Sequence, residues 1–164
     1  MIVLAVNGLK YNFEMNMGRP KWTEEELHHR LVLGTEIFDC TILNVGNPQC
    51  AVFVPDFDFD WRAAGAGIER HPYFPNKTNV SFIYRLDEHT IDVRFFERGA
   101  GETMSSGTGS TGAAIAAVLR GLVKSPIHVR TPAGLLELKW NGGEDEAFLT
   151  GPAEIVARGD FYYD

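Results

Sequence analysis

The chain has 164 residues, which is enough for one domain with a buried core. Fifteen basic and 22 acidic residues give a net charge of −7, which argues against an electrostatic nucleic-acid surface. The sequence has no apolar run of membrane-spanning length, no signal-peptide core, and too few cysteines for a disulfide framework. We therefore expect a cytoplasmic protein without nucleic-acid or membrane partners.

Short runs rich in Val, Ile, Phe and Tyr predict strands, because turn signals separate them. In chain order, β-prone runs lie at residues 1–13, 37–45, 51–54, 79–86 and 90–96. In the last run Ile91, Val93 and Phe95 alternate with polar residues, which predicts one buried face.

Three segments predict helices, at residues 23–33, 60–70 and 112–122. In the first, Thr23 and Glu26 have capping-box spacing and the pattern stops before Gly34. The third is apolar nearly all round, which predicts burial on every side. We expect an α/β (α+β) fold, a mixed and mostly antiparallel sheet curled around this central helix, because the helices of a doubly wound sheet would keep a polar face.

The segment "GTGSTG", residues 107–112, has the spacing of a dinucleotide-binding loop before a helix. Such a loop directly follows a strand, with an acidic residue about 20 positions later for the ribose. Here ten residues, "ERGAGETMSS", separate the loop from the preceding predicted strand, and the first carboxylate downstream is Glu137. We therefore reject nucleotide binding. The free N–H groups at a helix start bind a carboxylate as well as a phosphate.

Glu97 and Arg98 precede this glycine-rich segment. They could pair with the ammonium and carboxylate of a zwitterionic ligand. The alternative is a simple capped turn, with Ser105 as the cap and Glu97 and Arg98 as a solvated surface pair.

"ERGAGETMSSGTG" before an alanine-rich helix resembles the second half of diaminopimelate epimerase. Five further segments resemble that family in the same order: "MNMGRP", "NVGNPQCAVFV", "IERHPYFPNKTNVSF", "TPAGLLELKW" and "LTGPAEIV". The resemblance implies that residues 1–164 form a single domain similar to the C-terminal lobe of a two-lobed enzyme. The family's N-terminal lobe has no counterpart in this sequence, so the expected partners are that missing lobe or a second copy, besides a small amino-acid substrate.

This family interconverts L,L- and meso-diaminopimelate, in lysine and peptidoglycan-precursor biosynthesis, without cofactor or metal. It moves an α-proton between two cysteines, one from each lobe. The resemblance implies substrate-binding roles for Asn47, Asn79, Glu97 and Arg98, and carboxylate binding by the N–H groups of Gly107 and Thr108. For Asn79, a turn residue after "FPNKT" is the structural alternative.

Two positions depart from the family pattern. Ser106 stands where the family has its catalytic cysteine, and a serine hydroxyl is a far weaker acid than a thiol. Gln49, a further candidate for the site, stands where the family usually has histidine, so a titrating role there is lost. Cys40 and Cys50 lie in apolar runs and are expected to be buried structural residues.

The main functional hypothesis is a diaminopimelate epimerase-like isomerase that is inactive as this chain alone. The first alternative is a non-catalytic lobe that binds an amino acid or a partner chain. The second is a one-base isomerase or dehydratase acting on a related amino acid. Residues 1–13 are apolar and β-prone, with Lys10 as their one charge. We expect them to form an open edge and to support a homodimer.

Overall fold

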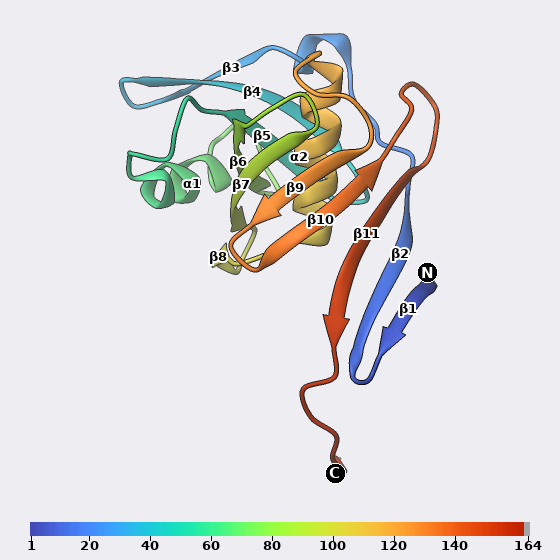
Figure 1. The fold of residues 1–164 in the computed structure, drawn as a ribbon. Helices are drawn as coiled ribbons and strands as arrows, with labels where there is room; N and C mark the ends of the chain where they lie inside the picture. Colours follow the sequence, from blue (N-terminus) through green and yellow to red (C-terminus); the bar gives the residue numbers. More distant parts are fainter. Residues whose placement is uncertain (163–164) are drawn as a thin grey trace.

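A computed structural model describes residues 1–162, which form a mixed 11-stranded sheet with two α-helices (Figure 1). The strands are β1 (Ile2–Asn7), β2 (Lys10–Gly18), β3 (His29–Leu33), β4 (Glu36–Asn44), β5 (Pro48–Phe53), β6 (Asn79–Arg85), β7 (Thr90–Glu97), β8 (Gly101–Thr103), β9 (Ile127–Thr131), β10 (Gly134–Lys139) and β11 (Ala147–Glu154). The helices are α1 (Trp61–Glu69) and α2 (Gly107–Leu119), with a 3₁₀ turn η1 (Glu24–Glu26).

The strand order is β1-β2-β11-β10-β9-β7-β6-β5-β4-β3, with β8 paired to β7 beside this path. The pairs β5–β6 and β7–β9 are parallel, and the other pairs are antiparallel. The sheet curls around α2, which contacts β4 to β7 and β9 to β11 (Figure 1). The predicted fold, a mostly antiparallel sheet around a central apolar helix, is confirmed.

Helix α2 is buried along most of its length because its residues are small or apolar. Every residue from Gly109 to Ala117 is buried, and Ile115 packs into the main core with strand residues of the concave face. A Cβ on Gly109 would lie 2.8 Å from Phe95 Cδ1, and one on Gly112 would lie 2.9 Å from Gln49 Cγ. Two of the three glycines in "GTGSTG" thus allow close packing of the helix on the sheet.

Helix α1 covers the other face of the sheet and confirms the helix predicted at residues 60–70. Its buried residues Trp61, Ala64 and Ile68 recur at helical spacing and belong to a second core cluster that includes Phe82. The Asp60 side chain accepts the Ala63 N–H at 3.0 Å and caps the helix.

The helix predicted at residues 23–33 is wrong. Thr23 Oγ1 donates to Glu26 Oε2 at 2.9 Å, but the Thr23 side chain makes no capping hydrogen bond to the backbone, and helical structure in this segment is confined to η1. From His29 onward the chain pairs with β4 as strand β3, with Leu31 buried and Val32 exposed. The period-two burial and the strand partner outweigh the local capping signal.

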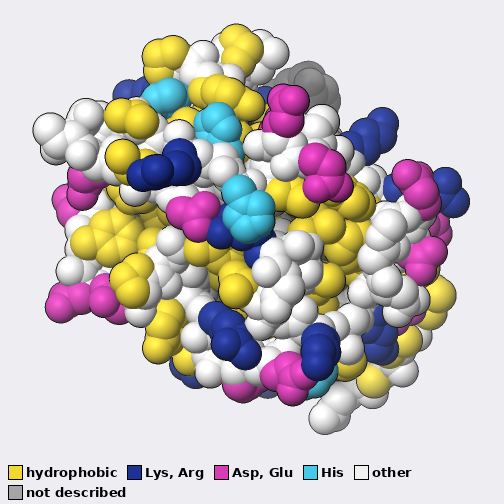
Figure 2. Space-filling model, turned by 90° about the horizontal axis from the view of Figure 1, so that it is seen from above, with side chains coloured by type: hydrophobic (Ala, Val, Ile, Leu, Met, Phe, Trp, Pro, Cys, Tyr) yellow, Lys and Arg dark blue, Asp and Glu magenta, His cyan; other side chains and the backbone are white. Residues whose placement is uncertain are grey.

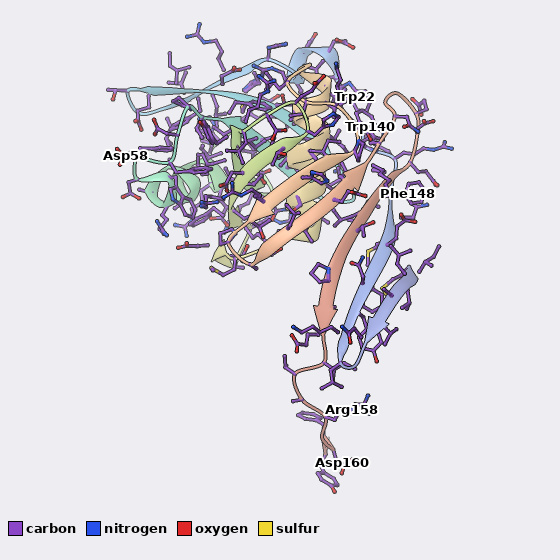
Figure 3. All side chains as sticks on the ribbon, viewed as in Figure 1. Trp22, Asp58, Trp140, Phe148, Arg158 and Asp160 are labelled. Carbon is purple, nitrogen blue, oxygen red and sulfur yellow. The ribbon has the colours of Figure 1, made fainter. Side chains whose placement is uncertain are left out.

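The N-terminal ribbon, which we define as β1, β2 and residues 151–154 of β11, projects from the body at the end where α2 begins (Figure 1). β1 is an edge strand, and all six of its residues are exposed. The open edge predicted for residues 1–13 is therefore confirmed for β1 alone, because residues 10–13 lie in β2, which pairs with both β1 and β11. Figure 3 shows Arg158 and Asp160 on the tail that leaves β11, beyond the body, whereas Trp22 and Trp140 meet edge to face near the opposite end, with ring centroids 5.7 Å apart.

The surface of the body carries charges of both signs. On the face in Figure 2, Lys and Arg side chains lie interspersed with Asp and Glu side chains, without a broad patch of either sign. Within residues 1–162, no helix is long and apolar enough to cross a membrane.

Candidate active site

Ser106 forms the N-cap of α2. Its backbone is extended, with φ −146°, and its Oγ accepts the Gly109 N–H at 3.1 Å. The prediction that Ser105 is the cap is wrong, because Ser106 directly precedes the first helical residue and its hydroxyl alone reaches the third N–H. Ser106 is also buried, with 8% of its surface exposed. The Ser106 hydroxyl oxygen is therefore already engaged as the hydrogen-bond acceptor that caps α2.

The N–H groups of Gly107 and Thr108, at the start of α2, have no hydrogen-bond acceptor within the helix. Gly109 N–H bonds to Ser106 Oγ, and Ser110 N–H bonds to the Ser106 carbonyl at 2.9 Å. Gly107 and Thr108 have no carbonyl one turn earlier in the helix to accept from them. Gly107 is exposed, so its backbone is accessible to a ligand. The positive end of the helix dipole adds to the attraction for an anion.

Asn47 lies against this helix start, in the turn between β4 and β5. Its Nδ2 donates to Thr108 Oγ1 at 3.2 Å, and its Oδ1 accepts from Gln49 Nε2 at 2.7 Å. Gln49 is 1% exposed and packs its side chain against Gly112. Its Oε1 has no hydrogen-bond partner within the described chain. Gln49 thus orients the Asn47 side chain by a hydrogen bond, and its amide does not titrate.

Asn79 is the first residue of β6 and joins two other segments. Its Nδ2 donates to the Pro48 carbonyl at 3.0 Å, and its Oδ1 accepts the Arg98 N–H at 3.0 Å. The alternative that Asn79 is a turn residue is wrong, because Asn79 lies in a strand and its side chain bridges two distant segments. The Pro48 contact uses one of the two amide N–H donors of this buried asparagine.

Glu97 and Arg98 each bond to a neighbouring segment. Glu97 Oε1 accepts from Thr103 Oγ1 at 2.8 Å, and the exposed Arg98 donates from Nη1 to the Asn76 carbonyl at 3.2 Å. In the part of the chain that the structure describes, no ion pair joins Glu97 to Arg98. Arg98 is exposed, as the alternative of a solvated surface pair expects, whereas Glu97 is half-buried.

The predicted site residues form one connected set. Asn47 links the β4–β5 turn to the helix start through Thr108. Asn79 links the same region to the turn after β7, because it bonds to both the Pro48 carbonyl and the Arg98 N–H. A surface depression of about 420 Å³ lies at one end of this set, where Pro48, Lys77 and the predicted site residue Arg98 belong to its lining. Free N–H groups, amides, a carboxylate and a guanidinium together suit a zwitterionic amino acid.

Sequence reasoning missed Glu69, a buried carboxylate at the end of α1. Its Oε1 accepts the Gly99 N–H at 3.0 Å, and Arg70 and Lys77 lie 3.3 Å and 3.6 Å from its oxygens. Burial raises the pKa of Glu69, but the Gly99 hydrogen bond and the two cations outweigh it and hold that pKa below the ordinary value. The signal was available: Glu69 falls on the same helical stripe as the apolar residues of α1.

Comparison with known proteins identifies the family. A family model described as diaminopimelate epimerase matches residues 41–156. The chain belongs to the diaminopimelate epimerase family. Curated diaminopimelate epimerases of Aromatoleum aromaticum and Pelotomaculum thermopropionicum are 42% and 38% identical to it, over 82% and 91% of this chain. The matches cover 49% and 57% of those relatives, so the chain spans about half the length of the curated diaminopimelate epimerases it matches.

Solved structures show the same fold at lower identity. A hydroxyproline epimerase from Agrobacterium vitis superposes with a TM-score of 0.65 at 15% identity, over 88% of this chain and 51% of that one. A probable proline racemase from Agrobacterium radiobacter gives a TM-score of 0.63 at 14% identity, over 91% of this chain and 54% of that one. The fold of a diaminopimelate epimerase family member is thus shared with other epimerases and racemases.

Proposed function

We propose that this chain supplies one half of the active site of a cofactor-independent diaminopimelate epimerase. The observation that carries the proposal is the start of α2, where the N–H groups of Gly107 and Thr108 lack intrahelical partners and Asn47 contacts Thr108. In the proposed reaction the substrate carboxylate lies at these N–H groups. Asn47, Asn79, Glu97 and Arg98 bind the remaining polar groups of the amino acid.

The start of α2 suits the electronic demand of α-proton removal. An α-proton is a weak acid, and the negative charge that develops on its removal spreads into the adjacent carboxylate. Preorganised N–H donors at that carboxylate stabilise the transition state more than the ground state. The helix dipole acts in the same direction.

Ser106 limits what this half can do. The oxygen of Ser106 accepts the Gly109 N–H, and the unperturbed acidity of a serine hydroxyl lies far below that of a thiol, whose pKa is about 8.5. We propose that Ser106 is a poor proton acceptor, and that turnover depends on a base outside residues 1–164. The first lobe of a two-lobed enzyme is the proposed source of that base, and residues 1–164 act as the single second-lobe domain.

A second candidate function is a non-catalytic lobe that binds an amino acid, and the cap hydrogen bond of Ser106 favours it. The two candidates share the ligand but differ in turnover. A one-base isomerase or dehydratase would also keep the ligand site and would need proton removal from one face alone.

Solvent deuterium incorporation separates these candidates. The purified chain is incubated with L,L-diaminopimelate in deuterium oxide, and α-deuterium is followed by mass spectrometry. The proposal predicts no detectable exchange, because general acid–base groups contribute about 10²–10⁴-fold each. Rapid exchange by the chain alone would contradict it. If the chain is joined to a first lobe, Ser106→Cys is expected to raise the exchange rate, and an unchanged rate would indicate that another reaction was selected.

A further inference from the structure

Glu69 is the most deeply buried carboxylate that the proposed reaction does not use. Its side chain is 3% exposed, although it is the last residue of α1 and the next residue, Arg70, is exposed. A buried carboxylate is stable when hydrogen bonds and opposite charges compensate its lost hydration. Glu69 has both, from the Gly99 N–H and from the Arg70 and Lys77 side chains.

One of these contacts holds the turn that follows β7. Gly99 directly follows Glu97 and Arg98, and its φ of +78° lies in the left-handed region that glycine adopts without strain. The hydrogen bond from Gly99 N–H to Glu69 therefore fixes the direction in which this turn leaves the sheet. The Arg98 N–H, one residue earlier, bonds to Asn79 Oδ1.

The other contacts hold the loop that leads into β6. Lys77 has a φ of +60°, an unfavourable value for a residue with a side chain, and its Nζ lies 3.6 Å from Glu69 Oε1. The Thr78 N–H bonds to the Glu69 carbonyl at 3.3 Å. Glu69 thus contacts the loop immediately before Asn79 twice: its carbonyl accepts the Thr78 N–H, and its carboxylate pairs with Lys77.

A second ion pair provides a contrast. Arg120 pairs with Asp39, whose side chain is 51% exposed, at the end of α2 opposite to the predicted site residues Gly107 and Thr108. The Glu69 cluster instead connects the loop before Asn79 with the turn that carries Glu97 and Arg98. These contacts fix the position of the two segments relative to each other.

We propose that Glu69 is a positioning residue, which holds the Glu97–Arg98 turn and the loop before Asn79 in register and so sets the affinity of the site for an amino acid. The effect of Glu69 on affinity rests on the proposed function. Its role in holding the two segments together rests on the contacts alone. Glu69→Ala removes the acceptor of Gly99 and the partner of Lys77. Glu69→Gln keeps an acceptor oxygen and loses the charge.

The test follows backbone amides of the ¹⁵N-labelled chain by NMR, with meso-diaminopimelate as the titrated probe. Glu69→Ala is expected to raise the apparent Kd at least about tenfold, the effect of losing a hydrogen bond to a charged group. Glu69→Gln is expected to stay within about threefold of the wild type, since its oxygen still accepts the Gly99 N–H. Asp39→Asn, which weakens the remote ion pair, is the control and should leave the Kd unchanged.

Hydrogen exchange without ligand gives the second readout. In Glu69→Ala the amides of Gly99, Arg98 and Thr78 should exchange together at least about tenfold faster, whereas in Glu69→Gln the Gly99 amide stays protected. Unchanged exchange at Gly99 would overturn the anchoring, and faster exchange at Gly99 alone would show that Glu69 does not join the two segments.

The outcomes separate this inference from the proposed function. If the wild type does not bind the amino acid, the proposed function fails, and the exchange data alone decide whether Glu69 anchors both segments. If exchange rises but affinity is unchanged, Glu69 is structural and the positioning role is wrong. If Glu69→Ala does not fold, Glu69→Gln decides: its neutral acceptor should move the Gly99 amide proton upfield, and an unmoved resonance contradicts the contact.

Discussion

The body and the N-terminal ribbon belong to one continuous sheet but differ in burial. In the body, strands such as β6 and β7 have residues that are fully buried between α1, α2 and the sheet. In the ribbon, β1 is as apolar in composition, yet all of its residues are exposed. A helix covers the sheet in the body and none covers the ribbon in residues 1–162 (Figure 1).

The difference shows that a covering helix, more than apolar composition, decides which part of this sheet becomes core. The face of the ribbon continues from the core, because Leu149 is buried while its neighbours along the same face, Gly151 and Ala153, are progressively more exposed. A Cβ on Gly107 would lie 3.6 Å from Leu149 Cδ2, so the start of α2 lies against β11 two residues before the ribbon begins. The candidate site thus lies where the covered and uncovered regions meet.

The largest expected effect concerns association through the ribbon. An uncharged edge strand such as β1 recruits another strand, and a second copy is the partner always present. We expect light scattering to report a homodimer, and Leu4→Glu to convert it to a monomer without changing the circular dichroism of the body. Thr35→Glu, at the exposed β3–β4 turn, is the control. A strict monomer at high concentration would show that the ribbon is stable without a partner.

The next effect compares equivalent truncations in the two regions. Ile115→Ala in α2 should lower the free energy of unfolding by about 2–5 kcal/mol, because Ile115 is fully buried and the change leaves a cavity. Leu4→Ala in the monomeric chain should change it by less than about 0.5 kcal/mol, since Leu4 is 51% exposed. Urea unfolding monitored by tryptophan fluorescence measures both. Similar losses would mean that the ribbon is covered in solution.

Sequence patterns predicted most of the body. The alternation around Val93 and the all-apolar pattern around Ile115 each indicate burial, and these local signals agree with the final packing. The segment at 23–33 was predicted wrongly because its capping pair is local, whereas the pairing of β3 with β4 depends on residues that the pattern does not contain. Tertiary contacts outweighed a weak propensity.

The candidate site was predicted from the family resemblance rather than from spacing. The resemblance named Asn47 and Asn79, but sequence alone could not show that Gln49 orients the first or that Arg98 N–H holds the second. Glu69 was missed because an acidic residue on a short helix is usually solvated. Its partners, Gly99 and Lys77, come from loops that only the fold brings together.

A smaller effect tests the boundary between the two regions at Ser106. Ser106→Ala should destabilise the chain by about 0.5–2 kcal/mol, because the Gly109 N–H loses its acceptor. Ser106→Cys should lose part of the same stability, since sulfur is a weak acceptor. Ser105→Ala is the matched control and should stay within about 0.5 kcal/mol of the wild type. Equal losses at both serines in thermal unfolding would contradict the assignment of the cap.

The smallest effect is the acid dependence that Glu69 adds. Burial raises the pKa of Glu69, but the Gly99 hydrogen bond, Lys77 and Arg70 together lower it from its ordinary value of 4.5. Because the folded pKa is the lower one, this contribution is complete above pH 4.5 and is lost as the pH falls through the folded pKa. Between pH 6 and pH 3, roughly the range over which carboxylates titrate, the stability of Glu69→Gln should fall less steeply than that of the wild type. Parallel curves from urea unfolding would contradict this contribution.

The central claim is that the start of α2 binds the carboxylate of an amino acid, and an NMR titration of the wild-type chain with meso-diaminopimelate tests it most directly. The account predicts saturable downfield shifts of the Gly107 and Thr108 amide protons, competed by sulfate, weakened in Asn47→Ala, and absent from the amides of β1. Resonances of Gly107 and Thr108 that stay fixed, while shifts gather elsewhere on the chain, would contradict it.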